Sequence, residues 1–170
     1  MGLDMYLTAR LGIYASLYEG HAELQKAIRA LLDDAGVTDG AMPPGTGGEW
    51  SDIGEVKGVD LRAAYWCKAN AIHGWFVANV QGGEDECKEH GVSREQLSEL
   101  RDLCQGILDM PHGHARDIHA AAVLPPTSGF FFGNTEIGEG YYADLTDTVK
   151  HLDAALKLPD SWDFYYQSSW

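Results

Sequence analysis

The sequence predicts a single α+β domain over residues 1–170, with a small antiparallel sheet that includes both terminal strands and is covered on one face by about four helices. Three observations support this prediction. Apolar and polar side chains alternate at the start of the chain, and a strongly aromatic segment, WDFYYQSSW, stands at the other end. Helical periodicity occupies most of the sequence between them. A chain of 170 residues is long enough for one hydrophobic core.

The two terminal strands are expected to build one polar and one apolar sheet face. In the first strand, Asp4 and Tyr6 lie between apolar residues, so they point away from the core. If the last strand is a neighbour, its apolar residues share the core face, and Tyr165 and Gln167 join Asp4 and Tyr6. Tyrosine rings beside carboxylate and amide groups suit a planar or sugar-bearing ligand. The same pattern also fits a solvated sheet face with high strand propensity.

Between the terminal strands, apolar periodicity predicts helices over about residues 24–35, 67–80, 93–110 and 139–156. Ser93 and Gln96 form a capping box at the start of the third of these helices. Weaker alternation predicts a strand over residues 56–65, with one side formed by Val59, Leu61, Ala63 and Tyr65. We expect a loop over residues 36–54, an irregular connection over residues 111–129, and either a short strand or a core plug at residues 130–132.

The charge of the chain limits its partners. The 26 acidic residues against 12 basic ones give a net charge of −14, which repels phosphate backbones, so we expect no direct binding of nucleic acid. The acidity fits a surface that keeps the protein soluble, or one that presents carboxylates to a basic partner. No apolar run approaches the roughly 18 residues of a membrane span, and the first residues do not resemble a signal peptide. We therefore expect a cytoplasmic protein without a membrane partner.

Three cysteines, an odd number, predict reduced thiols rather than a disulfide framework. Cys104 and Cys67 are expected in the core, and Cys87 is expected in an exposed polar loop. The aromatic residues of the last strand are expected to complete the core. If some of them stay exposed, they would suit a homo-oligomer or a partner protein.

A second group of candidate residues is Lys68, Asn70 and His73. Helical spacing places His73 on the apolar stripe, where it is either a core histidine with a satisfied hydrogen bond or a partly buried imidazole that contacts a ligand or moves protons. Asn70 lies three residues before His73, so both side chains could face one pocket. Lys68 supplies the positive charge nearest to them in the sequence.

A histidine-rich run offers a different chemistry. His112, His114, Asp117 and His119 are residue types that bind metals, but their spacing matches no standard signature. The segment Gly45–Gly48 is glycine-rich like a phosphate-binding loop, yet Glu49 and Trp50 follow it where a Walker loop needs Lys and Ser or Thr. The sequence therefore assigns no catalytic residue, no metal site and no cofactor.

The segments MGLDMYL, AYWCKANAIHGWFVANVQGG, VSREQL, SGFFFGNTE and WDFYYQSSW resemble a family of small uncharacterised proteins found in bacteriophages and bacterial genomes. The resemblance covers both ends and the middle of the chain. It implies a role in interference with the host or in handling nucleotide signals, and it implies no activity or catalytic residue.

From these observations we expect a non-enzymatic protein that binds a small polar or nucleotide-like ligand. The candidate contacts are Asp4, Tyr6, Lys68, Asn70, His73, Tyr165 and Gln167. An alternative is an acidic protein that blocks a host protein through its surface. A second alternative is a hydrolase that uses His73 or a metal site at His112, His114 and His119.

Overall fold

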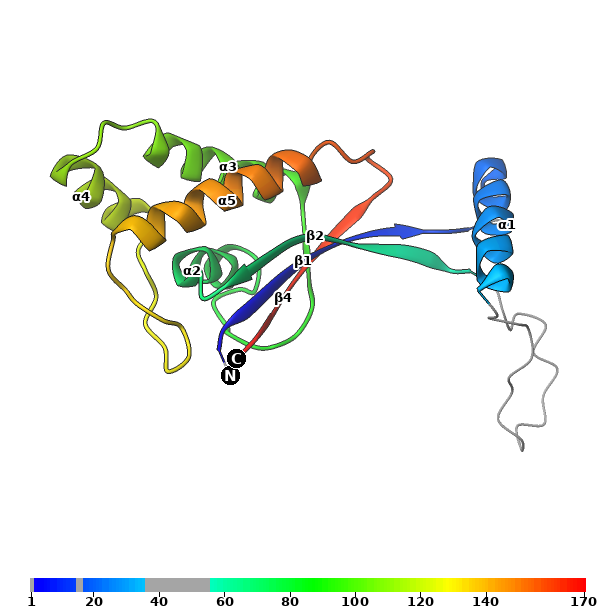
Figure 1. Ribbon diagram of the computed structural model, residues 1–170, viewed down its shortest axis with the longest axis horizontal. Coiled ribbons are helices and arrows are strands. Elements are labelled where there is room, and N and C mark those ends of the chain that lie inside the picture. Colours follow the sequence, from blue (N-terminus) through cyan, green and yellow to red (C-terminus); the bar gives the residue numbers. More distant parts are fainter. Residues whose placement is uncertain (1, 15–16, 36–55) are drawn as a thin grey trace. The chain divides into compact units, whose positions relative to one another are not determined.

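The computed structural model describes residues 2–14, 17–35 and 56–170 (Figure 1). Contacts divide the chain into two compact units, one formed by Met1–Arg10 with Asp60–Trp170 and the other by Leu11–Val59. All seven predicted site residues belong to the first unit. The predicted loop over residues 36–54 lies outside the described residues.

Within the described residues, the strands form a four-stranded antiparallel sheet in the order β2 (Gly58–Cys67), β1 (Asp4–Gly12), β4 (Asp163–Ser169), β3 (His90–Val92). The first and last strands are neighbours, as the sequence predicts. Their register places Tyr6 opposite Gln167, and Thr8 opposite Tyr165. The short β3 pairs with the free edge of β4, with His90 opposite Tyr166.

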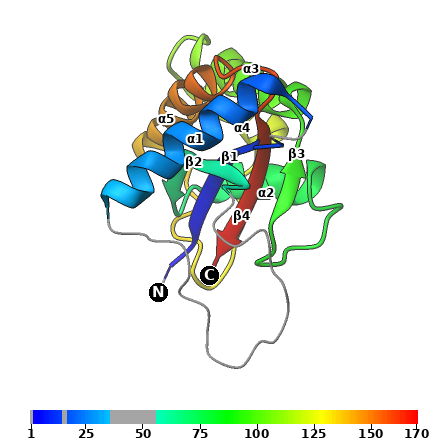
Figure 2. The same ribbon diagram turned by 90° about the vertical axis from the view of Figure 1, so that its right-hand side faces the viewer.

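Four helices of the first unit lie on one face of this sheet: α2 (Asn70–Asn79), α3 (Arg94–Leu108), α4 (His114–Val123) and α5 (Glu139–Ala155). Figure 2 shows them behind the strands, so the predicted layering is confirmed. The buried sheet face carries the apolar members of the alternating strands, which are Leu3, Met5, Leu7, Ala9, Ala64, Trp66, Phe164 and Tyr166. Burial of each large apolar side chain in this layer contributes about 1.5–3 kcal/mol relative to exposure.

Aromatic contacts join the helices to the sheet. The ring of Phe76 on α2 stacks on that of Tyr166, with centroids 3.9 Å apart and planes 8° apart. The indole Nε1 of Trp66 on β2 donates a hydrogen bond of 2.9 Å to Oγ1 of Thr148, which is buried on α5. The predicted capping box at Ser93 and Gln96 is present, with Ser93 as the N-cap and α3 beginning at Arg94.

Several details differ from the sequence-based predictions. The segment predicted as irregular contains α4, because its Ala-rich stretch has high helix propensity after the stop at Pro111. The strand β3 has only three residues, which is too short for periodicity to reveal. Strand β2 buries Ala64 and Trp66, on the side opposite to the apolar set named from the sequence, and Leu61 of that set is exposed.

Two further predictions concern single residues. Cys67 is exposed rather than buried, because it continues the outward-facing side of β2. Residues 130–132 form no strand: Phe132 is buried against the core, whereas the side chain of Phe130 is 95% exposed. Cys104 is buried and Cys87 is exposed, as predicted.

The second unit contains α1 (Glu19–Asp34). Two hydrogen bonds tie its parts together: the amide of Ile13 donates to the carbonyl of Lys57 over 2.9 Å, and Nε2 of Gln25 donates to the carbonyl of Val56 over 3.4 Å. Leu31, which the sequence places on the apolar stripe of this helix, is 69% exposed.

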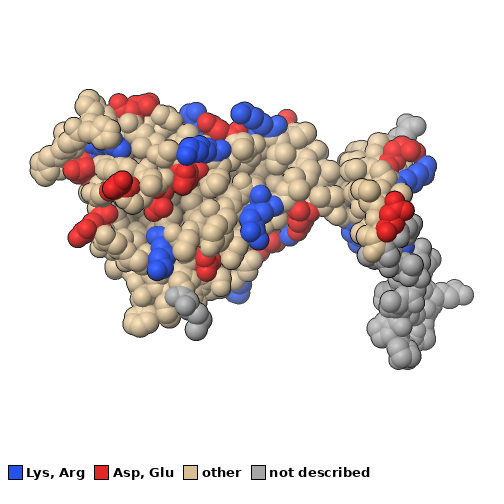
Figure 3. Space-filling model, in the orientation of Figure 1, with Lys and Arg blue, Asp and Glu red and all other residues tan. Residues whose placement is uncertain are grey.

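Acidic and basic side chains are interspersed on the face of the molecule that Figure 3 shows. Exposed acidic side chains are paired with nearby cations in several places; Arg10, for example, contacts both Asp60 and Glu89 at 2.9 Å. In the part of the chain that the structure describes, none of the helices has the length and apolar character needed to cross a bilayer.

Candidate functional site

One turn of α2 organises a site in the first unit. Asn70 is buried, and its Nδ2 donates hydrogen bonds of 2.9 and 2.8 Å to the carbonyls of Phe132 and Asn134. Its Oδ1 accepts a hydrogen bond of 3.2 Å from the amide of Thr127. One side chain thus fixes both arms of the loop between α4 and α5, because buried amide groups leave few of their hydrogen bonds unmade.

His73, one turn further along α2, is fully buried and bonded at both ring nitrogens. Its Nδ1 lies 2.8 Å from the hydroxyl of Tyr166, and its Nε2 lies 3.1 Å from Oδ2 of Asp85. A carboxylate only accepts, so Nε2 carries a proton that it donates to Asp85. Nδ1 lies beside the Tyr166 hydroxyl, and burial raises the pKa of Tyr166, which keeps that hydroxyl protonated.

This geometry gives His73 a positioning role. Both of its ring nitrogens are engaged, and it has no exposed surface. It holds Asp85 in place, and its ring meets that of Phe132 edge-on at a centroid distance of 4.9 Å. Asn70 and His73 both contact segments that form one structure, but neither side chain lines it.

That common structure is a pocket of about 310 Å³, which we call the aromatic pocket. It is lined by Asp85, Thr127, Ser128, Gly129, Phe130, Phe131, Phe132 and Trp170. The indole Nε1 of Trp170 donates a hydrogen bond of 3.2 Å to Oδ1 of Asp85, so both carboxylate oxygens are engaged. The pocket combines four aromatic rings with one carboxylate and has no Lys or Arg in its wall.

A second pocket, of about 290 Å³, lies at the junction of β2 and α2. It is lined by Lys68 and Asn70 together with Glu136, Glu139, Asp144 and neighbouring residues. Burial, with repulsion from Asp147, raises the pKa of Asp144 to about 6. Lys68 has a backbone φ of +60°, which is unfavourable for a residue with a Cβ. We call this the Lys68 pocket.

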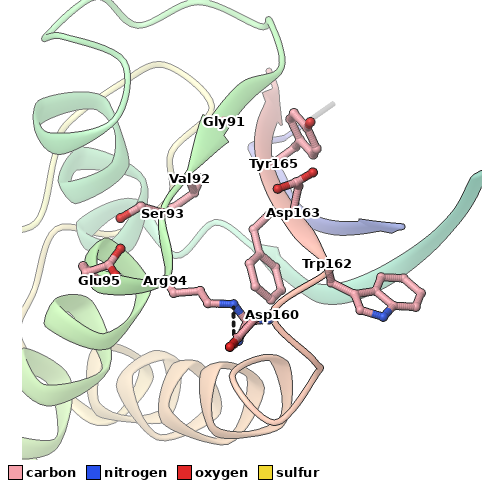
Figure 4. Close-up of a pocket in the computed structure, with 10 residues that line it drawn as sticks. Gly91, Val92, Ser93, Arg94, Glu95, Asp160, Trp162, Asp163 and Tyr165 are labelled. Atoms are coloured by element: carbon pink, nitrogen blue, oxygen red, sulfur yellow. Dashed lines mark ion pairs between the residues drawn. The ribbon is translucent and has the colours of Figure 1, made fainter. Parts of the chain in front are cut away.

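A third hollow, of about 490 Å³, is the open groove in Figure 4, between the β3–α3 junction and the start of β4. Tyr165 lines it, but in the close-up Tyr165 and Trp162 point away from the groove's centre. The guanidinium of Arg94 is engaged by the chain that follows α5: it donates to the carbonyls of Leu158 and Pro159 at 2.9 and 2.5 Å. Arg94 also lies 3.7 Å from Asp160, the ion pair drawn in Figure 4. These contacts join the start of α3 to the chain that follows α5, so we interpret the groove as a structural junction.

The four predicted residues of the terminal strands share the uncovered face of the sheet, as expected. Their polar groups are occupied by local partners. Asp4 accepts a hydrogen bond of 2.5 Å from the hydroxyl of Tyr65, whose ring lies 5.4 Å from that of Tyr6. Gln167 donates to the carbonyl of Cys87 over 3.1 Å, and the guanidinium of Arg10 lies 4.4 Å from the ring centre of Tyr165.

The seven predicted residues therefore do not converge on one pocket. Asp4, Tyr6, Tyr165 and Gln167 lie on the uncovered face, whereas Asn70 and His73 belong to α2, on the covered face. Lys68 lines its own pocket beside Asn70. The polar candidates of the terminal strands and those of α2 are therefore not neighbours, because the sheet lies between them.

The histidine run does not assemble a metal site. His112 accepts a hydrogen bond of 3.2 Å from the guanidinium of Arg116, and α4 begins between His112 and His119. Across residues 2–14, 17–35 and 56–170, no group of three or more His, Cys, Asp or Glu side chains could hold a metal ion. His73, the other residue of the hydrolase alternative, is fully buried.

Sequence reasoning missed Asp85, Trp170 and the Phe130–Phe132 wall as parts of one site. Asp85 stood among several acidic residues of a polar loop, where nothing in the sequence distinguishes it. A run of three phenylalanines after Ser128 and Gly129 was a usable signal, since consecutive aromatic residues in a loop cannot all face the core. Comparison of the chain with protein-family models, with curated proteins and with solved structures found no match.

Proposed function

We propose that this protein is a non-enzymatic binding protein that holds a small polar ligand in the aromatic pocket. The observation that carries the proposal is the support of this pocket by α2: Asn70 fixes the loop that bears the phenylalanines, and His73 fixes Asp85. Pockets for small molecules are mostly apolar, with a few oriented polar groups, and about 310 Å³ is near the lower end of their usual size.

The residues that line the pocket limit the class of ligand that it could bind. Four aromatic rings favour a ligand with an apolar or planar part, and Asp85 favours one that donates hydrogen bonds or carries positive charge. A phosphorylated nucleotide is disfavoured because no Lys or Arg lines the pocket. The role in host interference that the family resemblance implies is compatible with capture of a small signal molecule, and it stays a proposal.

The test is a binding screen with purified protein against neutral aromatics, amines, nucleosides and nucleotides, followed by calorimetry. Phe130 is the variant to use, because its side chain is 95% exposed and Phe130→Ala should leave the fold intact. We expect this variant to weaken binding severalfold. Ile118→Ala removes an apolar side chain that is 58% exposed on α4, outside the pocket, and should have no effect. Absence of binding by every class, or equal binding by both variants, would refute the proposal.

An acidic surface that blocks a host protein is a second candidate, favoured by the net charge of −14. Electrostatic docking of this kind weakens steeply with ionic strength. A pull-down from bacterial lysate at low and high salt would test it, and a partner retained equally under both conditions would count against it.

A further inference from the structure

The aromatic pocket contains one acidic side chain, Asp85, which contacts the imidazole of His73. Within the described residues, no Lys or Arg forms an ion pair with Asp85, and none lines the pocket. Its two hydrogen-bond donors, the imidazole of His73 and the indole of Trp170, orient the carboxylate. The side chain of Asp85 is 30% exposed, so its charge is directed to the pocket and its mouth.

The aromatic rings around the Asp85 carboxylate also favour a positively charged ligand. Phe130 and Phe131 meet edge-on at a centroid distance of 4.8 Å, and Phe132 and Trp170 are 6.2 Å apart. Aromatic faces carry partial negative charge and attract cations, most strongly in the case of Trp. A wall of several rings with one carboxylate is the arrangement by which proteins recognise quaternary and methylated ammonium groups.

We propose that the aromatic pocket binds an organic cation, with a methylated or quaternary ammonium group held among the rings of Phe130, Phe131, Phe132 and Trp170 and its charge facing Asp85. This inference rests on the proposed function and specifies its ligand class. A compact inorganic cation fits the site poorly, because it would exchange a strong hydration shell for aromatic carbon. A methylated ammonium group is weakly hydrated and matches both parts of the wall.

The same chemistry can come from two sources. One is a free small molecule such as choline, and the other is a trimethylated lysine side chain of a peptide. The high exposure of Phe130 leaves the pocket edge open to either. Titrations of choline and of a short trimethyllysine peptide, each against the unmethylated or neutral counterpart, separate these sources.

The decisive measurement compares choline with 3,3-dimethylbutan-1-ol, its uncharged carbon analogue, by calorimetry and by intrinsic tryptophan fluorescence. Because the two compounds have nearly the same shape, the ratio of their affinities reports the effect of charge. We expect choline or the trimethylated peptide to bind at least about tenfold more tightly than its neutral counterpart.

Two variants localise this effect. Asp85→Asn removes the charge, and we expect it to reduce the affinity ratio towards one. Trp170→Leu removes one ring, and we expect it to weaken the binding of choline more than the binding of 3,3-dimethylbutan-1-ol. Glu99→Gln removes an exposed carboxylate of α3, outside the pocket, and should leave the ratio unchanged. If Asp85→Asn fails to fold, Trp170→Leu and the ratio in the unaltered protein still decide the outcome.

Three results would overturn the inference. Equal affinity for choline and its neutral analogue, with no preference for the methylated peptide, shows that charge is not recognised. Binding of neutral aromatics alone refutes the preference for a cation but is still consistent with the proposed binding function of the pocket. If no compound binds, neutral aromatics included, both the preference for a cation and the proposed binding function are refuted.

Discussion

A Cβ built on Gly74 would overlap Oγ1 of Thr127 and lie 3.4 Å from the Cβ of that residue. Gly74 follows His73 on α2, and Thr127 begins the loop that forms the wall of the aromatic pocket. The helix and the loop approach each other this closely because Gly74 has no side chain.

We predict that Gly74→Ala destabilises the protein by about 1 kcal/mol, although Ala in a helix interior usually stabilises by a similar amount relative to Gly. The reason is that the new methyl group would push against Thr127 and its loop. Thermal or denaturant unfolding measures the effect. Gly106→Ala in α3 is the matched control, since a Cβ added at Gly106 would meet nothing within 4 Å, and this variant should be stabilised.

The double variant Gly74→Ala with Thr127→Ala should recover most of this loss, because it removes the hydroxyl that the new methyl group meets. Stabilisation by Gly74→Ala alone would show that the loop does not depend on this close approach.

A second prediction concerns backbone strain at Lys68. Its φ of +60° lies in the left-handed region, where residues with a Cβ are unfavourable by about 1 kcal/mol relative to Gly. Lys68→Gly and Lys68→Ala both remove the long side chain, so they differ mainly in this strain. We expect the Gly variant to be more stable than the Ala variant by about 1 kcal/mol in urea unfolding. A more stable Ala variant would contradict the left-handed conformation.

A third prediction follows from the raised pKa of Asp144, about 6. The folded protein binds this proton more tightly than the unfolded chain does, since an unperturbed aspartate has a pKa of 3.8. The cost of the ionised carboxylate is therefore fully present above pH 6, and it disappears as pH falls through the folded pKa towards the unfolded one.

Asp144→Asn should accordingly raise the free energy of unfolding by about 1–2 kcal/mol near pH 8 and have little effect near pH 4, with the gain reduced from the full shift because the group is only partly buried. Denaturant unfolding at several pH values measures this difference. Glu99→Gln, at an exposed position of α3, should change stability by less than about 0.5 kcal/mol at every pH. A pH-independent effect of Asp144→Asn would exclude titration of this carboxyl as its cause.

A fourth prediction tests the buried hydrogen bond between Trp66 and Thr148. Thr148→Val keeps the shape of the side chain but leaves the indole N–H without its acceptor, so we expect a loss of about 1–3 kcal/mol. Thr146→Val is the matched control on the same helix, because the Thr146 hydroxyl bonds only the carbonyl of Tyr142, four residues earlier. It should cost clearly less in thermal unfolding, and equal losses would argue against a special role of the Trp66 bond.

Local patterns in the sequence were sufficient for much of the architecture. Alternation at both ends predicted which side of β1 and β4 is buried, and the capping box at Ser93 located the start of α3, because these signals depend on a few neighbouring residues. The sequence did not predict which side of β2 is buried, because its alternation is weak and its register depends on its sheet partner.

For the candidate site, the sequence could not predict contacts between distant segments of the chain. The sequence indicated that Asn70 and His73 share a face of one helix, and this is correct. It could not show that their partners are Asp85, Thr127 and Tyr166, which come from three other segments of the chain.

By itself, the sequence determined the polar and apolar faces of the terminal strands and the strong acidity of the chain, since both follow from residue type and spacing. Only the tertiary structure decided that the polar candidates divide between the two sides of the sheet and that an acidic aromatic pocket forms beside α2. The physical reason is that a pocket is made by packing segments distant in sequence, and the geometry of that packing is a property of the whole fold.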